Sequence, residues 1–210
     1  MNTLDYIINK FELNRNGALP IEIPNYWRND LGVLFKELEF TVGVEIGTQE
    51  GIYAKVLCNS HPELKLYCVD PYEQYMEYND VSEEKLQYLK KQAKNYLAEC
   101  NVEFIYKFSS NAVLDFEDSS LDFVYIDGNH RFEYVVEDIS KWGKKIRVGG
   151  ILSGHDYFKN SLPFKKTSVY EAVHGYTKAY RIRPWFVIGR QDMLSGEKRD
   201  KPRSWMWVKS

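Results

Sequence analysis

The feature of this sequence that most constrains its fold is the alternation of short apolar runs with longer segments of helical periodicity. Each apolar run has the length of a buried strand, and most are followed by a segment whose apolar residues recur every three or four positions. The predicted strands cover residues 42–47, 65–70, 102–108, 121–126 and 151–156, and the predicted helices between them cover residues 52–60, 82–100 and 132–146. This order predicts βαβ units, and therefore a parallel sheet with helices on both faces.

Both ends of the chain depart from this alternation. Residues 3–13 and 28–40 have helical periodicity and precede the first predicted strand, and residues 14–27 between them contain a glycine and two prolines, which indicates an irregular link. Residues 185–190 and 204–209 are apolar and flank a polar loop, which predicts an antiparallel terminal hairpin. We therefore expect an α/β fold with a doubly wound, mostly parallel sheet of seven strands.

Length, charge and cysteine content exclude several kinds of protein. The 210 residues suit a single domain, residues 1–210, and the formal net charge of -2 gives no field that would attract nucleic acid or an anionic membrane. Cys58, Cys68 and Cys100 form no CxxC pair, which favours reduced thiols over disulfides or a zinc site. No apolar run has the length of a membrane span. We expect a cytoplasmic protein that binds neither nucleic acid nor a membrane.

The stretch EIGTQEG spans the end of the first predicted strand and the turn that leads to the next helix. It combines an acid with two glycines. Glycine permits a tight turn and a close approach of a ligand to the backbone, and the following helix offers free amide groups. The spacing of Gly47 and Gly51 is not the GxGxxG of a dinucleotide site. Glu45 would repel a pyrophosphate but could accept a hydrogen bond from an ammonium group. This turn therefore argues against NAD as the ligand.

Asp70 ends the second predicted strand, at the place where nucleoside-binding folds hold ribose hydroxyls through a carboxylate. The alternative is that Asp70 only caps its own turn. Together, Glu45 and Asp70 suit a ligand that carries adenosine and an amino acid instead of phosphates.

Three stretches in order resemble a known family. VEIGTQEG resembles the ExGxxxG first motif of class I S-adenosylmethionine-dependent methyltransferases, and CVDPY is similar to their second motif. Residues 121–157 resemble the fourth and fifth strand region of the small-molecule O-methyltransferase branch, in which IDGxH, GG and HDY follow one another. The resemblance implies a Rossmann-like fold and S-adenosyl-L-methionine-dependent methyl transfer to a hydroxyl group, such as that of a sugar or a natural-product intermediate.

The resemblance also implies which residues bind the cofactor. Glu45 would contact its methionine end, Gly47 and Gly51 would line it, Asp70 would hold the ribose, and Ser110 and Asn111 would lie near the adenine. The alternative for Ser109 or Ser110 is a helix cap.

Substrate contacts are expected from segments outside these motifs. In the family such segments form a lid over the substrate, a role that the resemblance implies for the helical residues 1–40. Several aromatic residues near the expected lid could stack on an acceptor, although ordinary packing is the alternative for each: Tyr26, Trp27, Tyr72, Tyr75, Tyr78 and Tyr157. Arg28 could pair with an anionic acceptor.

The stretch FVYIDGNHRFEY carries the candidate catalytic residues. Asp127 ends the fourth predicted strand and Asp156 the fifth, so a parallel sheet places both carboxylates at the same edge, where they could bind Mg²⁺ or another divalent cation. Catechol-type O-methyltransferases have a third ligand directly after the second acid, and Tyr157 stands there in this sequence. His130 is the candidate base, with a capping or core role as the alternative. His155 could be the base instead, or could orient Asp156.

Two other functions remain compatible with the sequence. One is a nucleoside-cofactor-binding protein without catalysis, which the acids and the histidine of the FVYIDGNHRFEY stretch disfavour. The other is a nicotinamide-dependent oxidoreductase, which the glycine spacing disfavours. The acceptor, the need for a metal and the oligomeric state, with a homo-oligomer as one option, are left open by the sequence.

Overall fold

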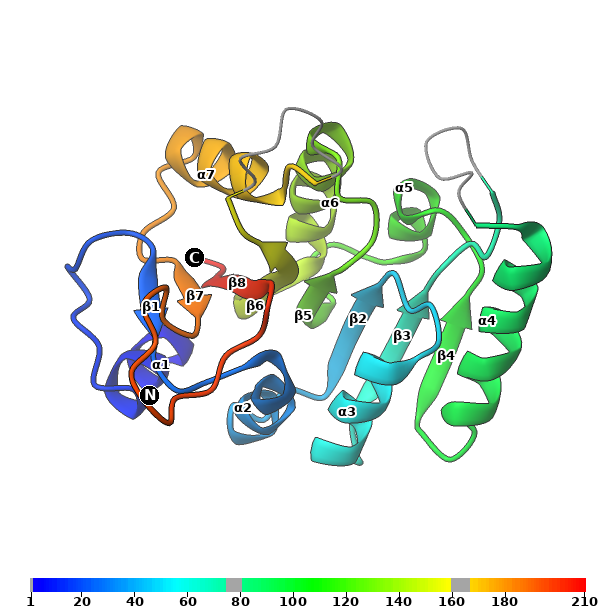
Figure 1. Ribbon diagram of the computed structural model, residues 1–210, viewed down its shortest axis with the longest axis horizontal. Coiled ribbons are helices and arrows are strands. Elements are labelled where there is room, and N and C mark those ends of the chain that lie inside the picture. Colours follow the sequence, from blue (N-terminus) through cyan, green and yellow to red (C-terminus); the bar gives the residue numbers. More distant parts are fainter. Residues whose placement is uncertain (1, 75–80, 160–166) are drawn as a thin grey trace.

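The computed structural model describes residues 2–74, 81–159 and 167–210, and its centre is one eight-stranded sheet. The strands are β1 (Ile21–Ile23), β2 (Val42–Ile46), β3 (Lys65–Val69), β4 (Val102–Ile105), β5 (Leu121–Ile126), β6 (Ile146–Tyr157), β7 (Phe186–Ile188) and β8 (Arg203–Val208). Their order is β1-β7-β8-β6-β5-β2-β3-β4 (Figure 1). Within the described residues, β8 runs antiparallel to both of its neighbours and the other pairs are parallel. The predicted mostly parallel α/β sheet with an antiparallel C-terminal hairpin is confirmed.

The sheet has one strand more than the seven that the sequence predicted. β1 lies in the link that its glycine and prolines indicated to be irregular, and it pairs in parallel with β7. Ile21 and Ile23 are buried on either side of Glu22. Pro20 and Pro24 directly flank this strand, and three residues are too few for an alternating pattern to be recognised.

Helices cover both faces of the sheet (Figure 1). One face carries α1 (Thr3–Lys10), α2 (Leu31–Glu37), α3 (Ile52–Ser60) and α4 (Glu83–Tyr96), and the other carries α5 (Ser109–Ala112), α6 (Phe132–Lys145) and α7 (Val169–Ala179). Two short 3-10 turns are η1 (Arg28–Asp30) and η2 (Val113–Asp115). The rings of Phe35 and Phe123 stack 4.1 Å apart in the core of the first face, whereas Trp142 and Trp205 are fully buried in the second.

Among the described residues, no helix has both the length and the apolar character needed to cross a membrane.

The N-terminal helices are part of the core. Ile7 of α1 and Leu31 of α2 are fully buried, and the hydroxyl of Thr3 donates a hydrogen bond of 2.6 Å to the carbonyl oxygen of Gly149, near the start of β6. This anchors α1 at the amino end of the parallel strands, away from the edge where the candidate site lies. The link between β1 and α2 reaches that edge through Arg28. The substrate lid predicted for residues 1–40 therefore stays a prediction, and this link is the part of it that reaches the candidate site.

Truncating a buried side chain of α1 tests its place in the core. We expect Ile7→Ala to lower the free energy of unfolding by about 2–5 kcal/mol, because a fully buried isoleucine leaves a cavity. Val33→Ala on α2 is the control: Val33 is 45% exposed, and its loss should change the free energy by less than about 0.5 kcal/mol. Urea unfolding measures both, and equally small changes would show that α1 is not a core element.

Candidate functional site

The candidate site lies at the carboxyl ends of the parallel strands. From β2 the chain continues to β3 and β4 on one side of the sheet, and β5 and β6 later extend the sheet on the other side. Ligands of doubly wound sheets bind at such a reversal, between the first strands of the two halves. Glu45 on β2, Asp127 directly after β5 and Asp156 on β6 come together at this edge, which we call the rim.

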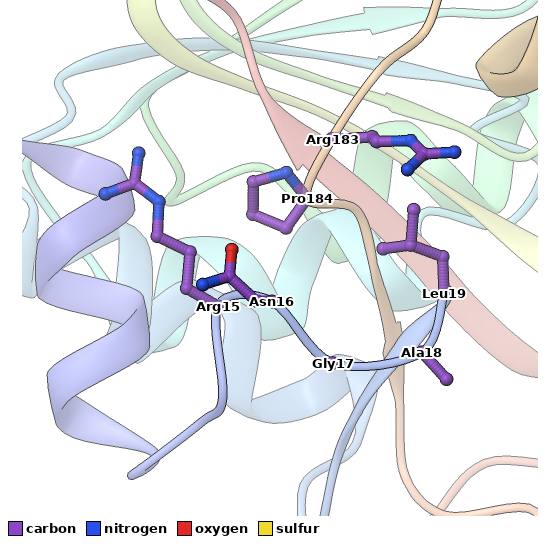
Figure 2. Close-up of a pocket in the computed structure, with 7 residues that line it drawn as sticks. All are labelled: Arg15, Asn16, Gly17, Ala18, Leu19, Arg183 and Pro184. Atoms are coloured by element: carbon purple, nitrogen blue, oxygen red, sulfur yellow. The ribbon is translucent and has the colours of Figure 1, made fainter.

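Two pockets of about 520 Å³ each open at other places on the surface. One lies between residues 15–19 and the pair Arg183 and Pro184, and shares no residue with the rim (Figure 2). The other is lined by residues that include Pro71, next to Asp70, and Asn111. The second pocket therefore adjoins the predicted cofactor site.

The turn after β2 is built on glycines with a positive φ. Gly47 has a φ of 89°, and a side chain there would overlap the carbonyl oxygen of Asp127. Gly51 has a φ of 78°, and a Cβ atom there would lie 2.9 Å from Leu97. The amide of Gly47 also donates to the carbonyl oxygen of Val69 at 2.8 Å. These contacts hold the ends of β2, β3 and β5 close together, and no side chain lies between β2 and the backbone of Asp127.

Glu45 is a buried acid with an unsatisfied oxygen. Its side chain is 2% exposed, and Oε2 has no hydrogen-bond partner among the described residues. Burial, aided by the nearby Asp127 and Asp70 carboxylates, raises the pKa of Glu45 to about 8. A buried acceptor without a partner is costly, and an ammonium group would both satisfy the oxygen and favour its ionised form.

Asp70 is held by the backbone on both of its oxygens. Oδ2 accepts a hydrogen bond of 2.9 Å from the amide of Gln49, and Oδ1 accepts one of 2.9 Å from the amide of Tyr72. The Tyr72 hydroxyl donates to the carbonyl oxygen of Gln49 at 2.7 Å. Burial raises the pKa of Asp70, and the two amides oppose this shift. The turn cap that the sequence left as an alternative is present, and it fixes the carboxylate beside the glycine turn, where each oxygen keeps a second lone pair.

The predicted adenine residues lie on the short helix α5. Asn111 is exposed and lines the pocket beside Pro71, and Ser110 is half-buried one residue earlier. Ser109 does not cap the helix. Its hydroxyl donates to the buried Asp138 of α6 and accepts a 2.7 Å hydrogen bond from the indole of Trp142. Sequence reasoning missed this network, because nothing in the local pattern connects α5 with α6.

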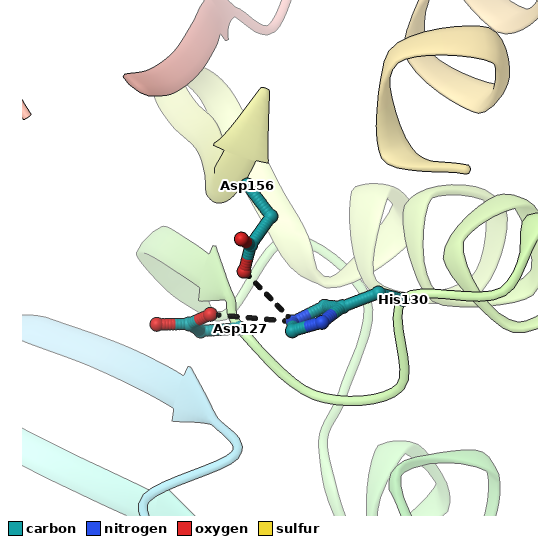
Figure 3. Close-up of side chains that lie close together, drawn as sticks. All are labelled: Asp127, His130 and Asp156. Atoms are coloured by element: carbon teal, nitrogen blue, oxygen red, sulfur yellow. Dashed lines mark ion pairs between the residues drawn. The ribbon is translucent and has the colours of Figure 1, made fainter. Parts of the chain in front are cut away.

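Asp127, His130 and Asp156 converge at the rim, as the sequence predicted (Figure 3). Nε2 of His130 lies 3.0 Å from Oδ2 of Asp156 and 3.5 Å from Oδ1 of Asp127. Nδ1 of His155 lies 3.4 Å and 3.7 Å from the same two oxygens. Asp156 has a φ of 55°, at a register shift in the pairing of β6 with β8. A non-glycine residue in this conformation costs free energy, and such residues cluster at functional sites.

The two carboxylates keep a proton on His130. Burial alone would lower the pKa of His130, but Asp127 and Asp156 outweigh it and raise this pKa to about 10. Burial opposes a low pKa for Asp156 as well, yet His130 and His155 hold it well below its usual range. At neutral pH the imidazole of His130 is therefore protonated in this arrangement, whereas the predicted role as a base requires the neutral ring.

Arg28 reaches the rim from the link before α2. Its Nη1 donates to Oδ2 of Asp127 at 3.3 Å, and its guanidinium lies 5.1 Å from the centre of the Tyr53 ring. The backbone of Arg28 is fixed from two sides, because its amide donates to Asp200 at 2.6 Å and its carbonyl oxygen accepts from the Tyr53 hydroxyl at 3.1 Å. Arg28 could pair with an anionic acceptor by the sequence prediction, and in the structure it pairs with Asp127 of the protein itself. No sequence pattern singled out Asp200.

Tyr157 does not supply a ligand at the rim. Its side chain is 3% exposed, and its hydroxyl lies 2.6 Å from Nε2 of His174, within an aromatic cluster that includes Tyr170 and Trp185. Packing accounts for this tyrosine. Tyr75 and Tyr78, two of the predicted stacking residues, lie outside the described residues.

Comparisons with known proteins agree with this geometry. The model of a family described as a methyltransferase domain matches residues 44–157, which run from β2 to the end of β6 and include the glycine turn and all three rim acids. No curated protein sequence matches the chain.

Several solved structures share the fold. An rRNA methylase from Streptococcus thermophilus is 16% identical with a TM-score of 0.56, over 86% of this chain and 93% of that one. The O-methyltransferase TomG from Streptomyces achromogenes, which is involved in tomaymycin synthesis, is 15% identical with a TM-score of 0.58, over 98% and 87%. Spermidine synthase from Thermotoga maritima is 12% identical with a TM-score of 0.58, over 87% and 59%. At these identities the likeness shows the fold alone.

Adding a side chain at Gly47 should destabilise the protein by more than the backbone strain of a positive φ alone would. We expect Gly47→Ala to lower the free energy of unfolding by about 2–5 kcal/mol, because a positive φ costs about 1–2 kcal/mol and the overlap with the Asp127 backbone adds about 1–3 kcal/mol. Gly196→Ala is the matched control, with a φ of 85° and no described atom within 4 Å, and should show only the strain. Denaturant titration compares them, and equal losses would contradict the close contact at Gly47.

Proposed function

Since the chain belongs to the methyltransferase domain family, as the match over residues 44–157 shows, we propose that it transfers a methyl group from S-adenosylmethionine to a hydroxyl group of a small molecule. A sugar or a natural-product intermediate would suit this role. The observation that supports the proposal most is the contact between the glycine turn and Asp127. It places the predicted cofactor residues and the rim residues next to each other, as a direct transfer between two bound molecules requires.

The cofactor side is supported by the donors and acceptors that the chain offers. The unsatisfied oxygen of Glu45 suits the ammonium group of the methionine end, and the turn from Gly47 to Gly51 lets the cofactor approach the backbone. Asp70 would accept hydrogen bonds from the ribose hydroxyls with its free lone pairs, and Ser110 and Asn111 would contact the adenine. Bound S-adenosylmethionine would supply a methyl group on a positively charged sulfur, and the sulfur would leave as a neutral thioether when the nucleophile bonds to the methyl carbon.

The acceptor side is assigned to Asp127, His130 and Asp156. A hydroxyl oxygen attacks a methyl group far better once it has lost its proton, so that orientation and proton removal are the main tasks of this part of the protein. The three side chains are partly buried and face one another, so they can hold an acceptor oxygen between them.

The charge of the chain favours a small acceptor over nucleic acid. Its formal net charge is -2, and proteins that bind nucleic acid rely on clustered Lys and Arg to neutralise phosphates. At the rim the positive group Arg28 is paired with Asp127, which leaves it poorly placed for a phosphate backbone.

The raised pKa of Glu45 gives the cofactor affinity a pH dependence. We expect S-adenosylhomocysteine to bind more tightly as the pH rises from 6 to 8, by up to about tenfold per pH unit, because its ammonium group binds the ionised carboxylate and a proton must leave Glu45. Isothermal titration calorimetry in buffers of different ionisation enthalpy measures both the affinity and the released proton.

Two variants control this experiment. Glu45→Gln should bind S-adenosylhomocysteine weakly and with little dependence on pH, whereas the exposed Glu63→Gln should behave as the wild type. An affinity for the wild-type protein that stays constant over this range would contradict the contact between Glu45 and the ammonium group.

The assignment of the acceptor side is tested by separating cofactor binding from turnover. We expect the wild-type protein to form S-adenosylhomocysteine and a methylated product from a panel of sugars and phenols, as detected by mass spectrometry. His130→Ala should bind the cofactor as the wild type does but lose turnover by about 100-fold or more, and the exposed Lys141→Ala on α6 should keep full activity. Methylation of RNA alone would overturn the small-molecule proposal, and unchanged turnover in His130→Ala would overturn the role of His130.

A further inference from the structure

The short helix α5, which carries the residues predicted to contact the adenine, is joined to α6 by buried hydrogen bonds. The hydroxyl of Ser109 donates to Oδ1 of Asp138 and accepts a hydrogen bond of 2.7 Å from the indole nitrogen of Trp142. Asp138 is 6% exposed, and Trp142 is fully buried. The first residue of α5 is therefore held by two side chains of α6 that lie one helical turn apart.

α5 depends on contacts with the rest of the protein. It has four residues, and a single helical turn is not stable in water on its own. Within the described chain, no side chain caps its N-terminus. Its apolar contacts come from Ala112, which is fully buried, and from Val113 directly after it. Ser109 therefore supplies a polar anchor at the end of α5 that has no cap.

The anchor also sets the rotation of α5 about its axis. Ser109 and Ala112 are three residues apart, so they lie on one face of the helix, which is turned toward α6 and the core. Successive residues of a helix are about 100° apart around its axis. Ser110 and Asn111 are thus turned to other sides, and Asn111 lines the pocket that also includes Pro71. A rotation of α5 would move both predicted adenine contacts at once.

Asp138 is costly to bury, which argues against a role in packing alone. Burial, together with the neighbouring Glu137, raises the pKa of Asp138 to about 7, while the hydrogen bond with Ser109 and the charge of Lys141 oppose this shift. The other buried residues of α6 are apolar: Val135, Ile139 and Trp142. An apolar side chain would fill this place at a lower cost in free energy. The hydrogen bond to α5 accounts for an acid here.

We propose that Asp138 positions the adenine-binding part of α5 through Ser109, without contacting the cofactor itself. Ser110 and Asn111 are the residues that it would align. The amide group of Asn111 can both donate and accept hydrogen bonds, as recognition of the edge of adenine requires. This inference rests on the proposed function, because it concerns how the adenine of the cofactor is held.

The preference of the protein for adenine over hypoxanthine tests this role. In S-inosylhomocysteine, a carbonyl oxygen replaces the amino group of the base of S-adenosylhomocysteine. We expect the wild-type protein to bind S-adenosylhomocysteine at least about tenfold more tightly, because the analogue leaves a hydrogen-bonding group of the site unpaired. Ser109→Ala and Asp138→Leu should each reduce this preference to about threefold or less. Isothermal titration calorimetry measures both affinities.

Three further variants separate positioning from a merely structural role. Asp138→Asn keeps an acceptor oxygen for Ser109 and should retain most of the preference. Glu45→Gln should weaken both ligands equally, because they share the same amino-acid end, and so leave the preference unchanged. Ser140→Ala is the matched control. It removes a hydrogen bond between α6 and Tyr176 of α7 instead, and it should bind both ligands as the wild type does.

Amide hydrogen exchange, measured by mass spectrometry, follows α5 without any ligand. We expect residues 108–113 to exchange at least about tenfold faster in Ser109→Ala than in the wild type, and at the wild-type rate in Ser140→Ala. Circular dichroism checks that each variant is folded, and Ser109→Ala decides the outcome if Asp138→Leu is not.

Three results would overturn the role of Asp138: unchanged exchange in Ser109→Ala, equal binding of both ligands by the wild type, or a full preference in Ser109→Ala. A wild-type protein that binds neither ligand would refute the proposed function instead. In that case faster exchange in Ser109→Ala would still show that α6 anchors α5, so the two failures can be told apart.

Discussion

The contact between a turn without a side chain and the backbone of the neighbouring strand is the constraint on which this site depends. Because Gly47 carries no Cβ atom, the end of β2 lies directly against the carbonyl group of Asp127. In the proposed function, the acids at these two strand ends have different tasks. Glu45 would bind the cofactor and Asp127 would contact the acceptor, so the closeness of the two strands would set the separation of methyl donor and acceptor.

The rim concentrates carboxylates that the fold does not fully neutralise. Glu45 is buried with an unpaired oxygen, whereas Asp127 and Asp156 share the protonated His130, with Arg28 as a further cation on Asp127. A buried polar atom without a partner costs free energy, so the unpaired oxygen of Glu45 lowers the stability of the protein. In the proposed function, the ammonium group of the cofactor would give this oxygen its partner.

Much of this arrangement could be predicted because it is encoded locally. The apolar runs of β2, β3, β5 and β6 and the residues that end them lie next to each other in the sequence, and the parallel sheet brings those ends together. Contacts made by distant segments could not be predicted. Arg28 and Asp200 are separated by 172 positions, and no periodicity connects them. β1 is too short for its alternation to be recognised, and the aromatic side chains around Tyr157 come from later segments of the chain. The approach of both histidines to the same two carboxylates became visible only from the distances in the structure.

We propose that this rim binds an S-adenosyl nucleoside, with Glu45 facing the amino-acid end of the ligand and not a phosphate. A thermal-shift comparison of S-adenosylhomocysteine, NAD and ATP at equal concentrations tests it most directly, since a ligand that binds only the folded state raises the melting temperature. We expect a clear rise with S-adenosylhomocysteine and none with NAD or ATP. Stabilisation by NAD without stabilisation by S-adenosylhomocysteine would contradict it.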